Sequence, residues 1–298
     1  MVGHSRRTGP VSASRALRAC AAVWALALLA LPHLAAAQVV DVQLVLAIDV
    51  SRSVDYNEAK LQRDGYVNAF RDPALIKVLL GGRYGQVGVT YLEWSTRGMA
   101  NVVAPWTLIA SPQDALAFAA TLDRNELGPG QRTSISSAID MGASLFLISG
   151  FRSDRRVIDI SGDGPNNDGG NVALSRDDAV ARGITINGLP ILNDDGGAGT
   201  LPDLDVYYRE CVIGGPGSFV IAAENFRSFS QAILRKLILE VADITPPGGY
   251  EFIAQPKVRL AQAGPYAGAG QFLQKYAPAC DVGERRTNQP QQFPRFGP

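Results

Sequence analysis

A short apolar run that stops at a carboxylate is the feature that most constrains this chain. Residues 44–53 read LVLAIDVSRS, in which five apolar residues precede Asp49, Ser51 and Ser53. Such a run is typical of a strand buried on both faces, as in the middle of a parallel sheet. Ligands collect outside the carboxyl ends of these strands, so we expect the three side chains to line a site. The alternative is that one of them only caps a helix, since Asp and Ser are preferred N-cap residues.

Strands and helices alternate along the following 200 residues or so. Runs of β-branched and apolar residues predict further strands at residues 86–95, 101–109, 156–160, 184–191 and 218–222. Apolar stripes and capping residues predict helices at residues 54–70, 74–80, 111–122, 133–150, 172–182, 204–211 and 226–241. This alternation predicts an α/β fold with a doubly wound, mostly parallel central sheet and helices on both faces.

The first 37 residues have the pattern of a cleaved export signal. Four arginines precede an apolar run from residue 19 to 31, and three alanines at residues 35–37 follow it. The run is short for a membrane span, and no later stretch of about 18 uninterrupted apolar residues exists. We therefore expect a periplasmic or secreted protein with no membrane span after signal cleavage. A retained N-terminal anchor is the alternative.

Removal of this segment changes which chemistry the chain can perform. It takes four of the 28 Lys and Arg residues and none of the 28 Asp and Glu residues, which leaves a net charge of 4 negative. A nucleic-acid partner is not expected, because such partners need a basic face. Both histidines, His4 and His33, are also removed. Mechanisms that need an imidazole, including a serine triad and a His-rich zinc site, are excluded.

Two cysteines, Cys211 and Cys280, remain after the signal segment with Cys20 is removed. In an exported protein they can form a disulfide that ties the C-terminal part of the chain to the domain. Their spacing does not distinguish this from two free thiols.

The composition changes at residue 243, after which Pro, Gly, Gln and Ala dominate. We expect a mostly irregular tail at residues 243–298, with a single strand near residues 250–254. The predicted organisation is a signal peptide at residues 1–37, a folded domain at residues 38–242 and this tail.

Two later segments place further oxygen ligands at the same edge of the predicted sheet. Thr133 lies at the start of a predicted helix, and Asp163 follows the predicted strand at residues 156–160. Two carboxylates and three hydroxyls form a set of hard oxygen ligands that suits Mg²⁺, with Mn²⁺ or Ca²⁺ as alternatives. The predicted metal ligands are therefore Asp49, Ser51, Ser53, Thr133 and Asp163.

These residues resemble the metal-ion-dependent adhesion site of the von Willebrand factor A domain, whose pattern is Asp-x-Ser-x-Ser, a distant Thr and a later Asp. Here the pattern is DVSRS at residues 49–53, Thr133 in GQRTSISSAI and Asp163 in ISGDG. More narrowly, the signal peptide followed by LAIDVSRSVD and VIDISGDGPNN resembles an exported bacterial subfamily of unknown function, DUF1194-like. The chain departs from the commoner later motif by having Ser161-Gly162 before Asp163.

The resemblance implies a Rossmann-like fold and a divalent cation bound directly by Ser51 and Ser53. Asp49, Thr133 and Asp163 would complete the set directly or through water. One coordination position would stay open for a carboxylate of a protein partner, so the chain is expected to bind proteins and not to be an enzyme.

Two alternatives remain. A metal-dependent hydrolase or phosphatase also uses an aspartate after a buried strand, but the best-known phosphatase pattern of this kind is Asp-x-Asp, where this chain has Ser51. A degenerate domain would keep the fold without binding a metal.

Other residues have simpler interpretations. Asp194 and Asp195 are expected in an acidic, solvated loop, with a Ca²⁺ site as the alternative. Tyr91, Trp94 and Trp106 are expected to pack in the core or an edge strand and not to form a ligand platform.

Overall fold

The computed structural model describes Gly3 and residues 37–124, 130–192, 201, 203–225, 228–244, 250–253, 258–262 and 280–288. All helices and strands given below belong to the unit Gln38–Pro298. The predicted signal peptide, apart from Gly3 and Ala37, lies outside the described residues, and so does the loop with Asp194 and Asp195.

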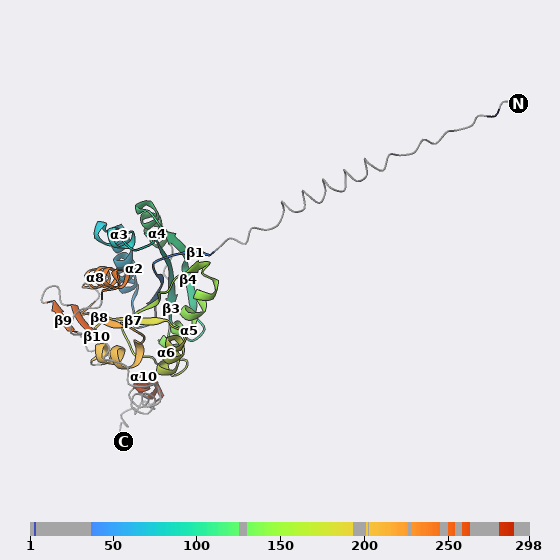
Figure 1. Ribbon diagram of the computed structural model, residues 1–298. Helices are drawn as coiled ribbons and strands as arrows, with labels where there is room; N and C mark the ends of the chain where they lie inside the picture. The colour runs from blue at the N-terminus through green and yellow to red at the C-terminus, as the bar shows by residue number, and fades with distance from the viewer. Residues whose placement is uncertain are drawn as a thin grey trace, which may run out of the picture. The chain divides into compact units, whose positions relative to one another are not determined.

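The core of this unit is a mixed sheet (Figure 1). Within the described part of the chain, the eight strands of this sheet are, in spatial order, β4 (Ala100–Ile109), β3 (Val87–Trp94), β2 (Gln43–Asp49), β6 (Arg156–Gly162), β7 (Thr185–Pro190), β8 (Phe219–Ala223), β10 (Val258–Gln262) and β9 (Tyr250–Ile253). The neighbours from β3 to β8 pair in parallel, whereas β4 is antiparallel at one edge and β10 and β9 are antiparallel at the other. The predicted α/β class with a mostly parallel sheet is confirmed.

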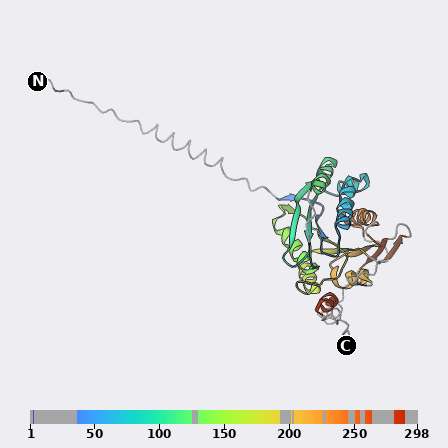
Figure 2. The same ribbon diagram turned by 180° about the vertical axis from the view of Figure 1, so that it is seen from behind.

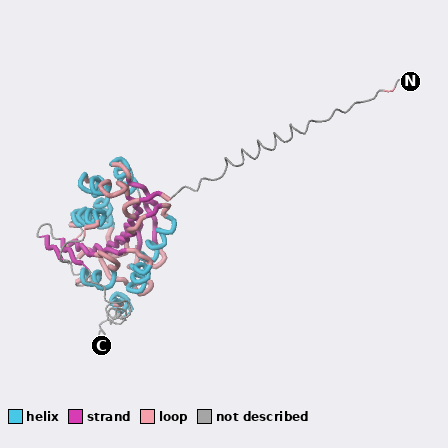
Figure 3. Tube along the Cα trace, viewed as in Figure 1, coloured by secondary structure: helices cyan, strands magenta, loops and turns pink. Residues whose placement is uncertain are grey.

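Helices cover both faces of the sheet, which lies between them in Figures 1, 2 and 3. The helices that pack on one face are α2 (Tyr56–Arg71), α3 (Pro73–Leu79), α4 (Pro112–Arg124) and α8 (Phe229–Ala242). The other face carries α5 (Ile135–Leu145), the short η1 (Phe146–Ile148), α6 (Val172–Ala181), α7 (Leu204–Tyr207) and the π-helical turn η2 (Tyr208–Val212).

Strand β2 shows why the sequence folds into these layers. Successive side chains of a strand point to opposite faces of the sheet. Leu44, Leu46 and Ile48 enter the core with α2 and α8, whereas Val45 and Ala47 enter the core with α5 and α6. Every residue of β2 is buried, so an uninterrupted apolar run is what this central position requires.

Helix α2 begins after Asp55, which forms a capping box with Glu58. The Asp55 carboxylate accepts a hydrogen bond from the Glu58 N–H, and the Glu58 carboxylate accepts one from the Asp55 N–H, both at 2.8 Å. This arrangement satisfies two backbone donors at the helix start. The alternative that Asp49, Ser51 or Ser53 caps this helix is therefore wrong, and all three side chains are available for another role.

The C-terminal part of the chain is more regular than its composition suggests. The strand expected near residues 250–254 is present as β9, but β10 and α10 (Val282–Asn288) were not predicted. A short parallel pair, β1 (Gln38–Val39) with β5 (Phe151–Arg152), was not predicted either.

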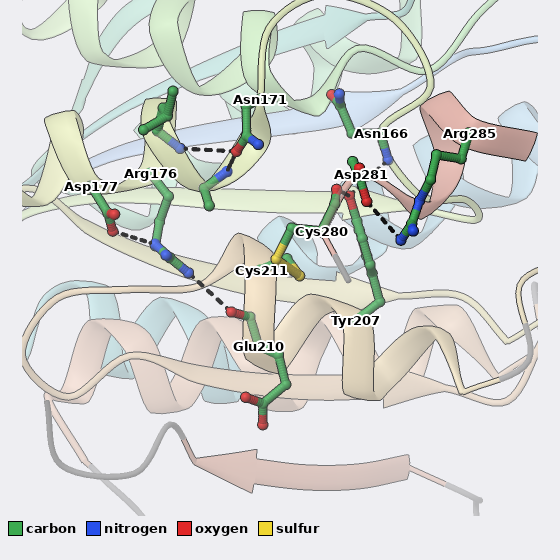
Figure 4. Close-up of a disulfide and its surroundings, with 12 residues drawn as sticks. Asn166, Asn171, Arg176, Asp177, Tyr207, Glu210, Cys211, Cys280, Asp281 and Arg285 are labelled. Atoms are coloured by element: carbon green, nitrogen blue, oxygen red, sulfur yellow. Dashed lines mark hydrogen bonds and ion pairs between the residues drawn. A yellow bond between two sulfur atoms is a disulfide. The ribbon is translucent and has the colours of Figure 1, made fainter. Parts of the chain in front are cut away.

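Cys211 and Cys280 form a disulfide that links η2 to the segment just before α10 (Figure 4). Their Cα atoms are 5.5 Å apart across a sequence separation of 69 residues, so of the two alternatives that the spacing left open, the disulfide is the one that the structure has.

A buried ion cluster joins β6 to α8. The Lys236 ammonium forms ion pairs with Asp159 and, at 2.6 Å, with Glu240, and all three side chains are shielded from solvent. The side-chain amide of Asn187 donates to the same Glu240 oxygen at 2.7 Å. Burial and the nearby Glu240 charge raise the pKa of Asp159 to about 7, although Lys236 opposes the rise. Two carboxylates thus share one buried cation.

The aromatic residues at the β3–β4 edge serve packing, as expected. Tyr91 and Trp94 are buried, and the half-buried Trp106 donates its indole N–H to the Leu145 carbonyl.

Within the described ranges, no helix is both long and apolar enough to cross a membrane.

Candidate metal centre

The chain turns after β2, and the Asp49 side chain stabilises this turn. One oxygen of its carboxylate, Oδ1, accepts a 2.7 Å hydrogen bond from the Ser51 N–H. A side-chain bond of this kind to the backbone two residues on forms an Asx turn. Asp49 and Ser51 are both buried, whereas Ser53 is exposed. The turn thus lines up three oxygen-bearing side chains from the buried strand end to the surface.

Asp163 reaches the same place from the end of β6. Because β2 and β6 are parallel neighbours, their carboxyl ends lie side by side. The Ser53 hydroxyl donates to Oδ1 of Asp163 at 2.7 Å, and Asp163 is only 6% exposed. The two strand-end segments therefore meet through side chains that the sequence predicts as ligands.

Thr133 completes the group from the segment that precedes α5. Its hydroxyl donates to Ser51 Oγ at 3.2 Å, and Ser51 Oγ lies 3.1 Å from Ser53 Oγ. All five predicted residues thus form one chain of contacts, with Asp49 held to the Ser51 backbone and Asp163 to the Ser53 hydroxyl. None of the predicted ligands is placed elsewhere.

The electrostatics of this group favour a cation. Burial raises the pKa of Asp49 well above its usual value, and the nearby Asp163 charge raises it further. Burial also raises the pKa of Asp163, to about 6, although the hydrogen bond from Ser53 opposes this rise. Oδ2 of Asp49 is buried and accepts no hydrogen bond from the described residues. Two crowded carboxylates, one with an unsatisfied buried oxygen, are the kind of environment that a bound cation stabilises.

The donor set restricts the kind of cation. It consists of two carboxylates and three hydroxyls, all hard oxygen ligands of the type taken by Mg²⁺ and Ca²⁺. In the described part of the chain, no group of three or more His, Cys, Asp or Glu side chains could hold a metal ion. A metal at this edge would therefore depend on the serine and threonine hydroxyls.

Two residues that the sequence did not assign to the site hold Thr133 and the start of α5. The Thr133 N–H donates to Asn167 Oδ1 at 2.9 Å, and the Thr133 carbonyl accepts from the Asn167 N–H at 2.8 Å. The neighbouring Asn166 accepts from the Ser136 N–H at 3.0 Å through its side-chain oxygen. In the sequence, the loop after Asp163 is dense in Asn, Asp and Gly. This composition predicts a turn but does not predict which residues the turn contacts.

Two glycines allow the segments to approach this closely. A Cβ on Gly130 would lie 1.8 Å from the Val50 carbonyl oxygen, so a larger residue would displace the segment leading to Thr133. A Cβ on Gly162 would lie 2.9 Å from Asp49 Oδ2.

Comparison with known proteins agrees with this architecture. A family model described as "Protein of unknown function (DUF1194)" matches residues 39–245. No curated protein sequence matches the chain.

Among solved structures, proximal thread matrix protein 1 from the mussel byssus has a TM-score of 0.50 at 16% identity, over 68% of this chain and 48% of that one. A second structure of the mussel protein, described as having a zinc-occupied MIDAS motif, matches with the same score and identity over 69% and 49% of the two chains. A von Willebrand factor type A structure from Catenulispora acidiphila has a TM-score of 0.47 at 13% identity, over 76% and 55%. This chain spans about half the length of the mussel chains, and at such identities the likeness concerns the fold alone.

Proposed function

The chain belongs to the family described as "Protein of unknown function (DUF1194)" and has a von Willebrand factor A-like fold, and from this premise we propose a function in metal-dependent protein binding. In this proposal it is an exported module that holds a divalent cation at the carboxyl edge of its sheet. Through that cation it binds a carboxylate of a protein partner.

The observation that carries the proposal is the convergence of five oxygen-bearing side chains from three separate segments. Ser51 and Ser53 would bind the cation through their hydroxyls, and Asp49, Thr133 and Asp163 would act directly or through water. The contacts between the three hydroxyls, at 3.1 and 3.2 Å, support this arrangement. So does the buried Asp49 oxygen without a hydrogen bond, because a cation would satisfy it.

Mg²⁺ is the cation that we propose first. It prefers oxygen ligands, and it is commonly held by one or two carboxylates together with water. Mn²⁺ and Ca²⁺ are the alternatives. The zinc-occupied motif described for the mussel protein supports the general idea of a divalent metal at this place in the fold, although the five candidate ligands of this chain all offer oxygen atoms.

An incomplete ligand set explains how such a site would bind a protein. With few carboxylates bound to it directly, the cation keeps enough positive charge to attract another one. The exposed Ser53 places one end of the set at the surface, where a partner carboxylate would reach it.

An exported location fits this role. We propose that residues 1–37 form a signal peptide, that residues 38–242 form the binding module with residues 243–298 as its C-terminal extension, and that the protein is periplasmic or secreted. The Cys211–Cys280 disulfide supports this proposal, because disulfides persist in oxidising compartments. We propose a non-enzymatic role, since the chain has Ser51 where the best-known phosphatase pattern of this kind has a second aspartate.

Isothermal titration calorimetry with Mg²⁺ and Mn²⁺ tests the metal directly. The parent chain should bind one equivalent, and Asp163→Ala should bind none, while Arg52→Ala, a change between the two serines at an exposed position, should bind as the parent does. A parent that binds neither of these ions, nor Ca²⁺ in the same titration, would refute the proposal. Partner capture with Mg²⁺ and with EDTA then tests the second half: proteins retained equally under both conditions would argue against a metal-bridged contact.

A further inference from the structure

The C-terminal helix lies against the loop that carries Asp163, and a disulfide fixes it there. We call residues 280–284 together with the Cys211–Cys280 bond the C-terminal clamp. Cys280 is fully buried and Cys211 is 1% exposed, so the bond lies inside the unit and not on its surface. Val282 packs against the same apolar core as Cys280. The start of α10 is therefore anchored by a covalent bond and by apolar contacts.

Three contacts connect this clamp to Asn166, and Figure 4 shows Asn166 with Tyr207 and Cys280, which take part in one of them. The Asn166 side-chain amide donates to Glu284 Oε1 at 2.6 Å. The Asn166 N–H donates to the Tyr207 hydroxyl at 3.1 Å, and that hydroxyl donates to the Cys280 carbonyl at 3.4 Å. A Cβ on Gly283 would lie 2.0 Å from the Asn166 carbonyl oxygen, so the two backbones are in direct contact. Asn166 is completely buried by these neighbours.

The same asparagine belongs to the framework of the candidate metal centre. It follows Asp163 by three residues, and its side-chain oxygen accepts from the first turn of α5 at Ser136. The next residue, Asn167, makes the two hydrogen bonds that hold the Thr133 backbone. A displacement of Asn166 would thus move the supports of both Thr133 and Asp163.

We infer that the C-terminal clamp positions the metal centre, with Glu284 and the Cys211–Cys280 disulfide as positioning groups that act through Asn166. This inference rests on the proposed metal-binding function. Glu284 is not itself placed as a ligand; its carboxylate orients the loop that carries Asp163 and, through Asn167 on that loop, supports Thr133. Outer partners that orient metal ligands have large effects on affinity in other proteins. The simpler interpretation is that the clamp only stabilises the fold.

Mn²⁺ titration of the folded chain at 25 °C separates the two interpretations. Glu284→Ala should weaken Mn²⁺ binding by about tenfold, the lower end of the range for losing an outer partner. Glu284→Gln should bind close to the parent, because the amide oxygen can still accept from Asn166. Arg285→Ala is the matched control, since Arg285 lies on the same helix but pairs with Asp281, and it should also bind as the parent does.

The disulfide is tested with a Cys211→Ser and Cys280→Ser double variant. It should remain folded at 25 °C by circular dichroism and bind Mn²⁺ about tenfold or more weakly. Leu75→Ala controls for general destabilisation, because it creates a cavity in the core on the opposite face and should leave affinity unchanged.

Equal Mn²⁺ affinity of the parent, the double variant and Glu284→Ala would overturn the clamp inference while leaving the proposed function intact. Failure of the parent to bind the metal would overturn both. If Leu75→Ala loses affinity as the double variant does, the effect is one of stability, and the clamp inference is wrong.

Discussion

The hydroxyl of Ser53 donates a 2.7 Å hydrogen bond to Oδ1 of Asp163, although 110 residues separate them in the chain. The bond joins the segments that follow β2 and β6, so the candidate ligands are held together by their own hydrogen bonds. A cation would exchange these bonds for coordination without a large rearrangement of the segments, since their strands are fixed side by side in the sheet. Preorganisation of this kind lowers the entropy cost of binding.

The role of this bond leads to a first prediction, for Ser53→Ala. The change removes one proposed ligand and the hydrogen bond to the buried Asp163, so we expect Mn²⁺ affinity to fall by at least about tenfold and the melting temperature without metal to fall modestly. Calorimetric titration and thermal unfolding measure the two quantities. Affinity equal to that of the parent would exclude Ser53 as a ligand.

A second prediction concerns Asp49→Asn, for which binding and stability should respond differently. The oxygen of the neutral amide can still accept the hydrogen bond from the Ser51 N–H. The substitution also removes a buried carboxylate whose negative charge is disfavoured by the nearby Asp163 charge. We expect metal binding to be lost, whereas the free energy of unfolding without metal should equal or exceed that of the parent. Residues retained at a cost in stability are typical of functional sites. A large loss of stability would indicate a structural role instead.

Both predictions concern residues that the sequence alone identifies as candidate ligands. Each candidate ligand lies next to a strand or helix that the local sequence pattern predicts. The apolar run before Asp49 and the strand before Asp163 mark buried parallel strands, whose ends meet at one edge of a sheet. Thr133 precedes an amphipathic helix. The fold class and the five candidate ligands can therefore be predicted from patterns within short windows.

The residues that support the site carry no such signal. Asn166 accepts from α5 and donates to Glu284, which lies 118 residues further along the chain. Strand β10 pairs with β8 although its surrounding composition is typical of an irregular tail. Pairings of this kind depend on tertiary contacts that override local propensity. The cysteine spacing likewise left the disulfide undecided until the fold brought the two Cα atoms within 5.5 Å.

A third prediction concerns the contribution of the disulfide to stability. It closes a loop of 69 residues, and by the chain-entropy relation a loop of this size stabilises the native state by about 4 kcal/mol relative to the uncrosslinked chain. Urea unfolding of the Cys211→Ser and Cys280→Ser double variant should show a loss of this order.

The control for this experiment is a phosphine reductant. It should lower the free energy of unfolding of the parent and leave that of the double variant unchanged. A double variant as stable as the oxidised parent would mean that the bond adds nothing to the packing of the C-terminal segment.

The last prediction concerns the buried ion cluster, which makes stability depend on pH. Asp159 has its pKa raised to about 7 because of burial and the nearby Glu240. The ordinary value for the unfolded chain is 3.8, so between these values the native state binds a proton that the unfolded state does not. This contribution to stability is fully present at low pH and is lost as the pH rises through 7. Above pH 7, one ammonium faces two buried carboxylates.

Asp159→Asn should remove this dependence, since the amide is neutral at every pH and leaves Lys236 paired with Glu240. The variant should be at least as stable as the parent at pH 8. The difference between their free energies of unfolding should shrink between pH 7 and pH 5, by up to about 1.4 kcal/mol per pH unit. Urea unfolding across this range measures it, with Asp123→Asn, a change at an exposed ion pair with Arg71, as the matched control. Parallel curves for the parent and Asp159→Asn would mean that Asp159 stays charged throughout, with Lys236 outweighing both burial and the Glu240 charge.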